Sequence, residues 1–323
     1  MNVSNSWFRA LLQQVAWGLL TLWVVSLIVF MGTNIRPPES IATQVLGRAA
    51  TPAQLQEFVH TNGLNRPALV RYGSWLTGMA QGDWGKSLAT QKDVLSEVVP
   101  RLKRSVILAV VTLIVSVPIA IQLGIFMARR LGRAADFAAL WPLVILSALP
   151  EFVIGLTLIT LFAVKLRWLP VDSTALNYGS GLDMILAYVL PAATLAISVI
   201  PYIARVARAS IGETLGAAYA RAGVLRGLSA RRVLWDYSIR NAAVPILNSI
   251  TINFVYLLGG VLVVENVFGF PGVGQLLVNA IQRADMATVQ AVALILGTFV
   301  VVANIVTDIF AVLLTPRMRA GLE

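Results

Sequence analysis

The sequence predicts an all-α polytopic membrane protein with six transmembrane helices, and three observations lead to this fold class. Of the 323 residues, 58% are hydrophobic and only 12% are charged, whereas a soluble domain carries about 25% charged residues. The mean hydropathy is +0.79. The apolar residues form six long runs, and a helix needs about 20 residues to cross a bilayer. This composition excludes a disordered chain or a coiled coil and argues against a soluble enzyme.

The first run predicts an N-terminal transmembrane helix within residues 1–36. Its uncharged stretch, between Arg9 and Arg36, is longer than the apolar region of a signal peptide, which has about 7–15 residues. Residues 37–100 follow, with enough polar sequence for small helices and too little apolar sequence for a large core. The other helices are expected near 105–128, 137–164, 184–204, 241–264 and 286–307, within a domain of residues 101–316 that is followed by a tail, 317–323.

Basic residues in the short loops predict the orientation. Arg129, Arg130 and Arg133 crowd the turn between the second and third runs, and residues 205–240 hold seven arginines against two acidic residues. Short loops rich in lysine and arginine stay in the cytoplasm. We therefore expect both of these loops and both termini to be cytoplasmic, with residues 37–100 outside. The formal charge of +10 is then explained by the basic loops that orient the helices in the membrane, and nucleic acid is not expected as a partner.

Several kinds of chemistry are excluded by the residues that are missing. The chain has no cysteine and a single histidine, His60, so neither a cysteine-ligated nor a histidine-built metal site is expected. The segment 82–87, GDWGKS, superficially resembles a phosphate loop, but the glycine that such a loop needs five positions before Gly85 is Ala80. We expect no metal, no nucleotide and no other cofactor bound by this chain.

The most informative segment is the basic loop 205–240. Residues 217–226 are helical by propensity, Gly227 is placed to end that helix in the left-handed conformation, and Ser229 is placed to cap a second helix that begins at Ala230. A DNA-binding helix-turn-helix has similar charge, but a loop between two membrane spans would pin its recognition helix against the bilayer. A loop resting on anionic lipid and a docking element for a cytosolic partner remain the two interpretations.

This loop resembles the EAA loop of ABC-transporter permeases, and more narrowly that of the oligopeptide/dipeptide/nickel permease family. The stretches concerned are 219–234, YARAGVLRGLSARRVL, and 240–245, RNAAVP. Residues 222–226 depart from the usual family pattern. The matching positions are Tyr219, Arg221, Gly227, Leu228, Ser229, Arg240, Asn241, Ala242 and Pro245. Further similar stretches lie at 62–72, 82–87, 149–155, 168–170, 265–274 and 315–319, so the resemblance covers nearly the whole chain.

The resemblance implies a type I ABC importer permease, which is half of a translocation channel in a bacterial inner membrane and not itself an enzyme. The implied partners are a second, homologous permease, two cytosolic ATP-binding subunits that hold ATP and magnesium, an external solute-binding protein, and membrane lipid. The implied solutes are peptides or related small molecules. The implied ATPase-coupling residues are Tyr219, Arg221, Ala222, Gly223, Gly227, Leu228 and Ser229.

Polar side chains within the apolar runs are candidates for the translocation path. Glu151 lies in the run 137–164, where a charge is costly in the bilayer. It is interpreted either as a path carboxylate that contacts a substrate amine or a partner helix, or as a protonated or hydrogen-bonded group beside the Pro150 kink. Asn253 and Tyr256 line the path or form hydrogen bonds between helices.

The segment 265–274 is a candidate gate. It is rich in glycine and unusually apolar for an external loop, with Glu265, Phe268 and Phe270 as its candidate residues. A plain connector is the alternative interpretation. For the whole chain, the alternative function is an ion-coupled secondary transporter that works without an ATPase, but such a protein predicts internal repeats and ion ligands in the membrane. Among the acidic residues, only Glu151 is expected near the centre of a span. A membrane-embedded enzyme is not supported, because the sequence shows no set of catalytic groups.

Overall fold

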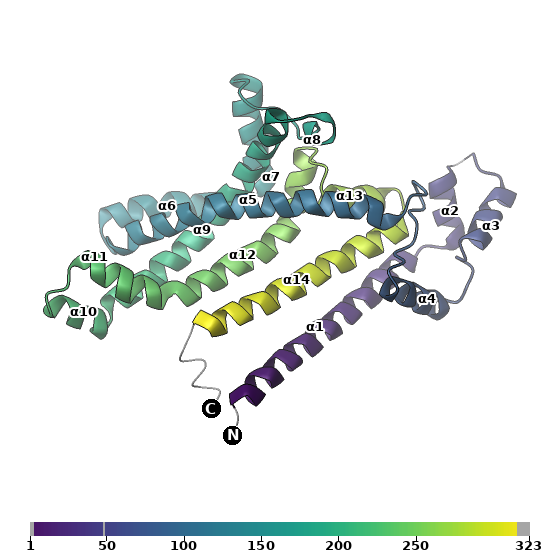
Figure 1. Ribbon diagram of the computed structural model, residues 1–323. Helices are drawn as coiled ribbons and strands as arrows, with labels where there is room; N and C mark the ends of the chain where they lie inside the picture. Colours follow the sequence, from purple (N-terminus) through teal and green to yellow (C-terminus); the bar gives the residue numbers. More distant parts are fainter. Residues whose placement is uncertain (1–2, 48, 315–323) are drawn as a thin grey trace. The chain divides into compact units, whose positions relative to one another are not determined.

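The computed structural model describes residues 3–47 and 49–314, and within these ranges the regular structure is helical, without a β-strand (Figure 1). The helices before the centre of the chain are α1 Val3–Asn34, α2 Pro38–Leu46, α3 Pro52–Thr61, α4 Ala68–Ala80, α5 Val94–Ala128, α6 Ala134–Ala148, α7 Glu151–Leu158 and the π-helix η1 Ile159–Lys165. They are followed by α8 Ala175–Tyr178, α9 Leu182–Gly216, α10 Ala218–Leu225, α11 Ala230–Arg232, the π-helix η2 Val233–Ile239, α12 Arg240–Val267, α13 Val273–Gln282 and α14 Met286–Leu314.

Four helices are long and apolar enough to cross a membrane. They are Leu12–Asn34 in α1, Val94–Ala128, Leu182–Gly216 and Met286–Val306 in α14. Two bent pairs pass the same criterion when each pair is taken together: Ala134–Ala148 with Glu151–Lys165, and Ala230–Leu257 with Val261–Val267. The described part of the chain therefore holds four to six candidate spans, in agreement with a polytopic helical membrane protein.

The predicted helix at 137–164 is not one continuous helix, because the chain breaks before Pro150. Leu149 is extended, with φ −81° and ψ 131°, and α6 and α7 are bent by 102° relative to each other. A proline clashes with a helical conformation of the residue before it and has no N–H to continue the ladder. The break therefore leaves Glu151 as the first residue of α7 rather than in the middle of a straight helix.

The structure divides into two compact units. The first is built mainly from residues 106–270, and its hydrophobic core forms where α9 packs against α6, α7 and α12 (Figure 1). Leu195, Ile203 and Leu257 are completely buried in this core. The long helices approach closely: a Cβ atom added to Gly124 in α5 would lie 2.5 Å from Cβ of Ala207 in α9. A small residue is therefore required at this crossing.

The second unit consists of residues 10–105 and 271–301. Asp285 ties its segments together, because the carboxylate accepts hydrogen bonds from Ser87 Oγ at 2.5 Å, Leu88 N at 3.0 Å and Thr288 Oγ1 at 2.7 Å. A small apolar core forms beside it from the start of α5, α13 and α14. Its buried residues are Val94, Val98, Val273, Leu276, Ala291 and Val292.

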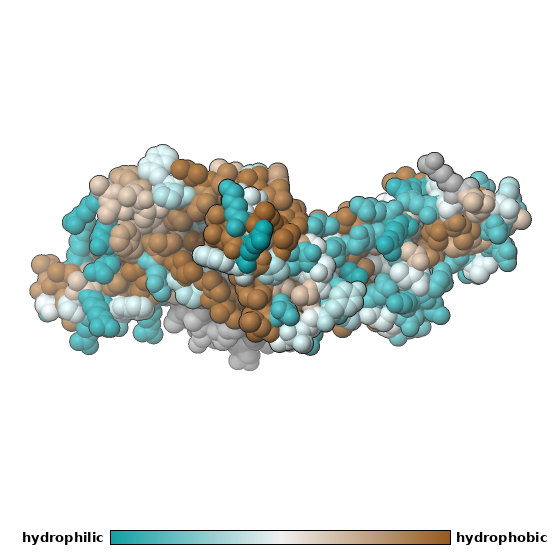
Figure 2. All heavy atoms as spheres, turned by 90° about the horizontal axis from the view of Figure 1, so that it is seen from above, coloured by the Kyte–Doolittle hydropathy of each residue, from teal (hydrophilic) through white to brown (hydrophobic). Residues whose placement is uncertain are grey.

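Much of the molecular surface is hydrophobic. Hydrophobic atoms, brown in Figure 2, spread over the long helices, whereas the part that carries α2, α3 and α4 mixes them with hydrophilic atoms. On α6, Trp141 and Ile145 are each 61% exposed. Apolar side chains of this size are stable at a surface that lipid or another apolar surface covers.

Candidate functional site

The segment that follows α9 folds as the sequence predicts. Helix α10 ends in a Schellman motif: Leu228 N donates to Gly223 O at 3.1 Å and Gly227 N donates to Val224 O at 2.9 Å. Gly227 has φ +82°, a left-handed conformation that glycine adopts at little cost. Ser229 Oγ then accepts from Arg232 N at 3.4 Å and caps α11. These contacts confirm the predicted helix, tight turn and second helix.

The candidate coupling residues differ in burial: some pack against the rest of the segment and others are exposed. Gly223 is buried, and a Cβ atom there would meet side chains of Leu228 and Val233 at 3.5 Å. Tyr219 and Arg221 are exposed on α10. Ala222 and Leu228 are half-buried, and Gly227 and Ser229 are exposed at the turn. Gly223 thus lets α10 pack closely against Leu228 and Val233, which follow it in the chain. Tyr219 and Arg221 remain available to a partner.

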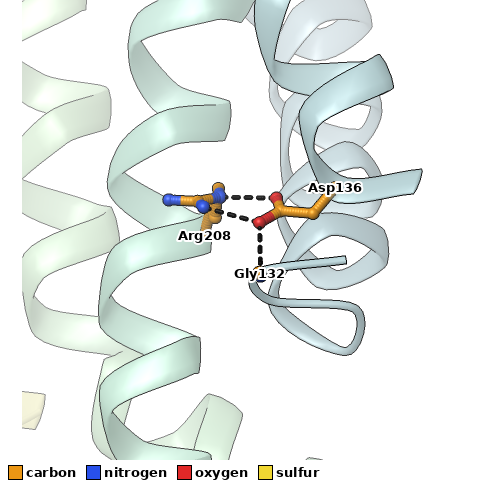
Figure 3. Close-up of polar contacts among 3 residues, drawn as sticks. All are labelled: Gly132, Asp136 and Arg208. Carbon is orange, nitrogen blue, oxygen red and sulfur yellow. Dashed lines mark hydrogen bonds and ion pairs between the residues drawn. The ribbon is translucent and has the colours of Figure 1, made fainter. Parts of the chain in front are cut away.

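A buried ion pair joins α6 to α9, the helix that precedes this segment. The Asp136 carboxylate, fully buried at the start of α6, accepts from Arg208 Nε at 2.7 Å and from Arg208 Nη2 at 2.6 Å (Figure 3). It also accepts from Gly132 N at 2.9 Å, in the turn between α5 and α6 (Figure 3). Arg208 lies on α9, about two turns before this helix ends at Gly216. The pair therefore joins the basic α5–α6 turn to the helix that leads into α10.

Sequence reasoning missed this pair. The sequence indicates Arg208 only as one of the arginines that orient the loop 205–240, and it does not mark Asp136 as a candidate residue. The available signal was modest: an aspartate follows a turn with three arginines, at the start of an apolar run. Its partner is 72 positions away, and no local pattern identifies which arginine of the later loop it meets.

The structure brings two of the candidate path residues together. Tyr256 in α12 donates its hydroxyl proton to Glu151 Oε1 at the start of α7, with 3.0 Å between the oxygens. Tyr256 is 51% exposed, and Glu151 is half-buried. Asn253 is different, because its side chain is buried and its amide donates to Ser249 O of the same helix at 2.8 Å. The pair is therefore open to a ligand, whereas the amide of Asn253 is turned to its own backbone.

The candidate gate is shorter and more buried than the sequence suggests. Helix α12 extends to Val267 and α13 begins at Val273, so Glu265 lies within a helix, with its side chain completely buried. Phe268 and Phe270 are also buried, in the core of the first unit. Burial accounts for the apolar character of the segment, because Phe268 lies beside Gly155 of α7 and Phe270 packs against Tyr188 of α9.

Backbone contacts hold the same short segment in place. Ser173 N donates to Phe268 O at 2.9 Å, and the Phe270 ring packs edge-on against Tyr188 with 5.2 Å between the centroids. Next to Ser173, Asp172 accepts hydrogen bonds from the N–H and the hydroxyl of Thr174, and these bonds lower the pKa of its carboxyl. The role of Glu265, Phe268 and Phe270 as a gate remains a prediction.

Comparison with known protein families covers both halves of the chain. The model of the binding-protein-dependent transport system inner membrane component matches residues 120–320. The model of the N-terminal region of the same kind of membrane component matches residues 7–109. Together the two matches contain both the coupling segment and the helices that precede it.

Two curated relatives are similar over most of their length. The "Probable peptide ABC transporter permease protein y4tP" of Sinorhizobium fredii is 34% identical over 297 residues, which are 92% of this chain and 94% of the relative. The "Glutathione transport system permease protein GsiC" of Escherichia coli (strain K12) is 30% identical over 300 residues, 93% of this chain and 95% of the relative. The similarity is thus not confined to one motif.

Solved structures of similar fold include a transporter. It is the crystal structure of an amino acid ABC transporter with histidines, which aligns with a TM-score of 0.51 at 16% sequence identity. The alignment covers 66% of this chain and 92% of the other chain. At this identity the likeness concerns the arrangement of the helices alone.

Proposed function

The chain belongs to the family of binding-protein-dependent transport system inner membrane components, and on this premise we propose that it forms half of a translocation channel for peptides or related small solutes. It is a permease subunit of an ATP-driven ABC importer, a multi-pass protein of the bacterial inner membrane, and a transport subunit rather than an enzyme. The similarity to importer permeases favours this function over an ion-coupled secondary transporter. The proposed solute class is supported by the names of the two relatives, which specify peptide and glutathione transport.

The arrangement in the membrane is part of the proposal. We propose six transmembrane helices in a type I importer fold, with residues 1–36 as the first, residues 37–100 outside, residues 101–316 as the main domain, and both termini in the cytoplasm. The four long helices and two bent pairs support six spans. The arginines of the α5–α6 turn and of residues 205–240 support a cytoplasmic position for both loops.

The partners follow from the family. An importer of this kind works with ATPase subunits and a solute-binding protein. We propose that the other half of the channel is a second, homologous permease, and that two ATPase subunits hold the ATP and magnesium. Helix α10 and its turn dock onto an ATPase, with Tyr219 and Arg221 as contacts and Gly223, Gly227, Leu228 and Ser229 shaping the turn around Ala222. The observation that carries this proposal is the exposure of Tyr219 and Arg221 on α10, a short helix whose end is held by the Schellman turn.

The test is co-purification of the tagged chain from native membranes in mild detergent, with mass spectrometry of its partners. We expect ATPase subunits, a second permease, and uptake into proteoliposomes that requires ATP. Changing Tyr219 and Arg221 together to alanine removes the proposed contacts, and Gly227→Val forces a branched side chain into the left-handed conformation. Both variants should lose most of the ATPase subunits and of the uptake.

Gly32→Val is the matched control, because a Cβ atom at Gly32 in α1 has no atom within 4 Å and the backbone there is helical. It should retain its partners and its uptake. Recovery of a homo-oligomer whose uptake follows a proton gradient and ignores ATP would overturn the importer function. Normal ATPase recovery in both coupling variants would instead overturn the docking role of α10 alone.

A further inference from the structure

The ends of two helices and the side of a third meet at Glu151. Helix α6 ends at Ala148, Leu149 and Pro150 are extended, and Glu151 begins α7. Tyr256 reaches the carboxylate from α12 through the hydroxyl-to-Oε1 hydrogen bond of 3.0 Å. The last carbonyl groups of α6 have no partner further along that helix, because the ladder stops at the break; Leu146 O alone among them receives the N–H of Leu149. The break therefore has the open carbonyl end of α6 on one side and the Glu151 carboxylate on the other.

The Glu151 carboxylate has no cation of its own. Among the described residues, the side-chain partner of Glu151 is the Tyr256 hydroxyl, and no lysine or arginine forms an ion pair with it. A carboxylate offers about four acceptor positions, and the Tyr256 hydroxyl occupies one of them. A charged carboxylate on a candidate membrane-spanning pair is costly without a partner, so such groups face a protein interior or a solute path.

The surface around the pair is apolar and aromatic. Phe152 is 47% exposed on α7, and Ile252 is 56% exposed one turn before Tyr256 on α12. Tyr256 is itself half exposed, and the π-face of a tyrosine ring attracts cations. One negative group thus stands on an exposed surface that otherwise suits apolar groups.

We propose that Glu151 and Tyr256 bind the protonated primary amine of the transported solute, such as the N-terminal ammonium group of a short peptide. The ammonium group donates three hydrogen bonds, which the free Glu151 oxygen, the tyrosine oxygen and the carbonyls at the end of α6 accept. Unwound carbonyls at the end of a broken helix coordinate cations in other transporters. Phe152 and Ile252 contact the apolar body of the solute. This inference rests on the proposed function, because it requires that peptides or related amines pass through the channel.

The test uses the purified complex of both permeases and the ATPase subunits without the solute-binding protein, so that the selectivity of that protein does not enter. The probe is a leucine tripeptide with a photoreactive diazirine leucine at its centre, in two forms: with a free N-terminal amine and with an acetylated one. After illumination, mass spectrometry measures the yield of adducts on α7 and α12. We expect about tenfold more adduct with the free amine, as a hydrogen bond between two charged groups predicts.

Glu151→Gln keeps the size of the side chain and removes its charge, so it should lower the yield with the free amine about tenfold and leave the acetylated probe unchanged. Tyr256→Phe should have a smaller effect, because the ring remains. The matched control on α7 is Thr157→Val, since the Thr157 hydroxyl donates only to Val153 O of its own helix, at 2.7 Å. It should label as the unsubstituted complex does.

Equal labelling by both probes, no labelling of α7 and α12, or free-amine labelling that survives Glu151→Gln would each overturn the proposal. So would loss of the second permease from purified Glu151→Gln complexes, which would assign the carboxylate to a cation of that subunit. Failure of the proposed function is distinguishable from these outcomes, because it appears in the unsubstituted protein as missing ATPase subunits or as uptake that needs no ATP.

Discussion

At the scale of single residues, the buried Asp136–Arg208 pair is a bidentate ion pair within the first unit. Two hydrogen bonds from one guanidinium and a third from Gly132 satisfy a carboxylate that is fully removed from solvent. A planar guanidinium matches a carboxylate in this bidentate way, whereas a lysine provides only a point charge. The pair thereby fixes the rotation of α9 relative to the α5–α6 turn.

Asp136→Ala should therefore destabilise the protein by about 3–5 kcal/mol, because it leaves the partly buried Arg208 and the Gly132 N–H without their acceptor. The measurement is thermal unfolding in detergent, followed by the fluorescence of the tryptophans. Asp236→Ala is the matched control. Its ion pair with Arg232 joins two exposed side chains at 3.4 Å, so its loss should cost about 1 kcal/mol or less. Equal destabilisation by the two changes would show that burial of the first pair contributes nothing.

At the scale of the helices, close packing depends on where glycine stands. Gly124 in α5 faces α9, and an added Cβ atom would lie 2.5 Å from Ala207 Cβ and 3.0 Å from Ala204 O. The second of these atoms belongs to the backbone and moves only if the helix moves. Gly32 in α1 has open space at the same position. The two glycines therefore differ in function although both lie in apolar helices.

Gly124→Ala should destabilise the protein by about 1–3 kcal/mol through overpacking, whereas Gly32→Ala should leave it unchanged or slightly more stable. The check is the unfolding temperature of the two variants, together with the yield of monodisperse protein from membranes. A Gly124→Ala variant as stable as Gly32→Ala would mean that α5 and α9 are not held at this distance.

These elements also show what a sequence can and cannot predict. Long apolar runs identify the spanning helices, because membrane insertion depends on composition over about 20 residues. The Gly227 turn is predicted because its conformation depends on adjacent residues. The break before Pro150 was expected only as a kink, since the size of a bend depends on what packs against both halves. The sequence marks Phe268 and Phe270 as unusually apolar for a loop, but the helices that cover them, α7 and α9, are distant in the sequence and are identified only in the structure.

The same distinction applies to the candidate site. Glu151 and Tyr256 were each identified as polar residues in apolar runs, but their hydrogen bond joins positions 105 residues apart. Asp136 and Arg208 likewise meet only after α6 and α9 pack. A single sequence indicates which residues are unusual for their surroundings, and the packed helices decide which of them meet.

At the scale of the whole molecule, orientation in the membrane is the property on which the proposed roles depend. Helix α10 reaches an ATPase only from the cytoplasm, and residues 37–100 reach a solute-binding protein only from outside. The chain contains no cysteine, so single cysteines report their side of the membrane without background. Three exposed positions suit this purpose: Leu69 in α4, Tyr178 in α8 and Leu225 in α10, which are 84%, 91% and 88% exposed.

Six spans with cytoplasmic termini place outside both residues 37–100, which hold Leu69, and the loop between the third and fourth spans, which holds Tyr178. In intact spheroplasts, a membrane-impermeant maleimide should therefore label the Leu69→Cys and Tyr178→Cys variants and leave Leu225→Cys unlabelled. In permeabilised cells that express each variant without the ATPase subunits, all three should react to a similar extent, because their exposure in the chain alone is similar and no ATPase covers α10; this comparison controls for reactivity. Labelling of Leu225→Cys alone in intact spheroplasts would invert the proposed topology and remove α10 from the reach of an ATPase. Labelling of Tyr178→Cys without Leu69→Cys would instead place residues 37–100 in the cytoplasm, and the first span would then require a different orientation from the one that the arginine-rich loops predict.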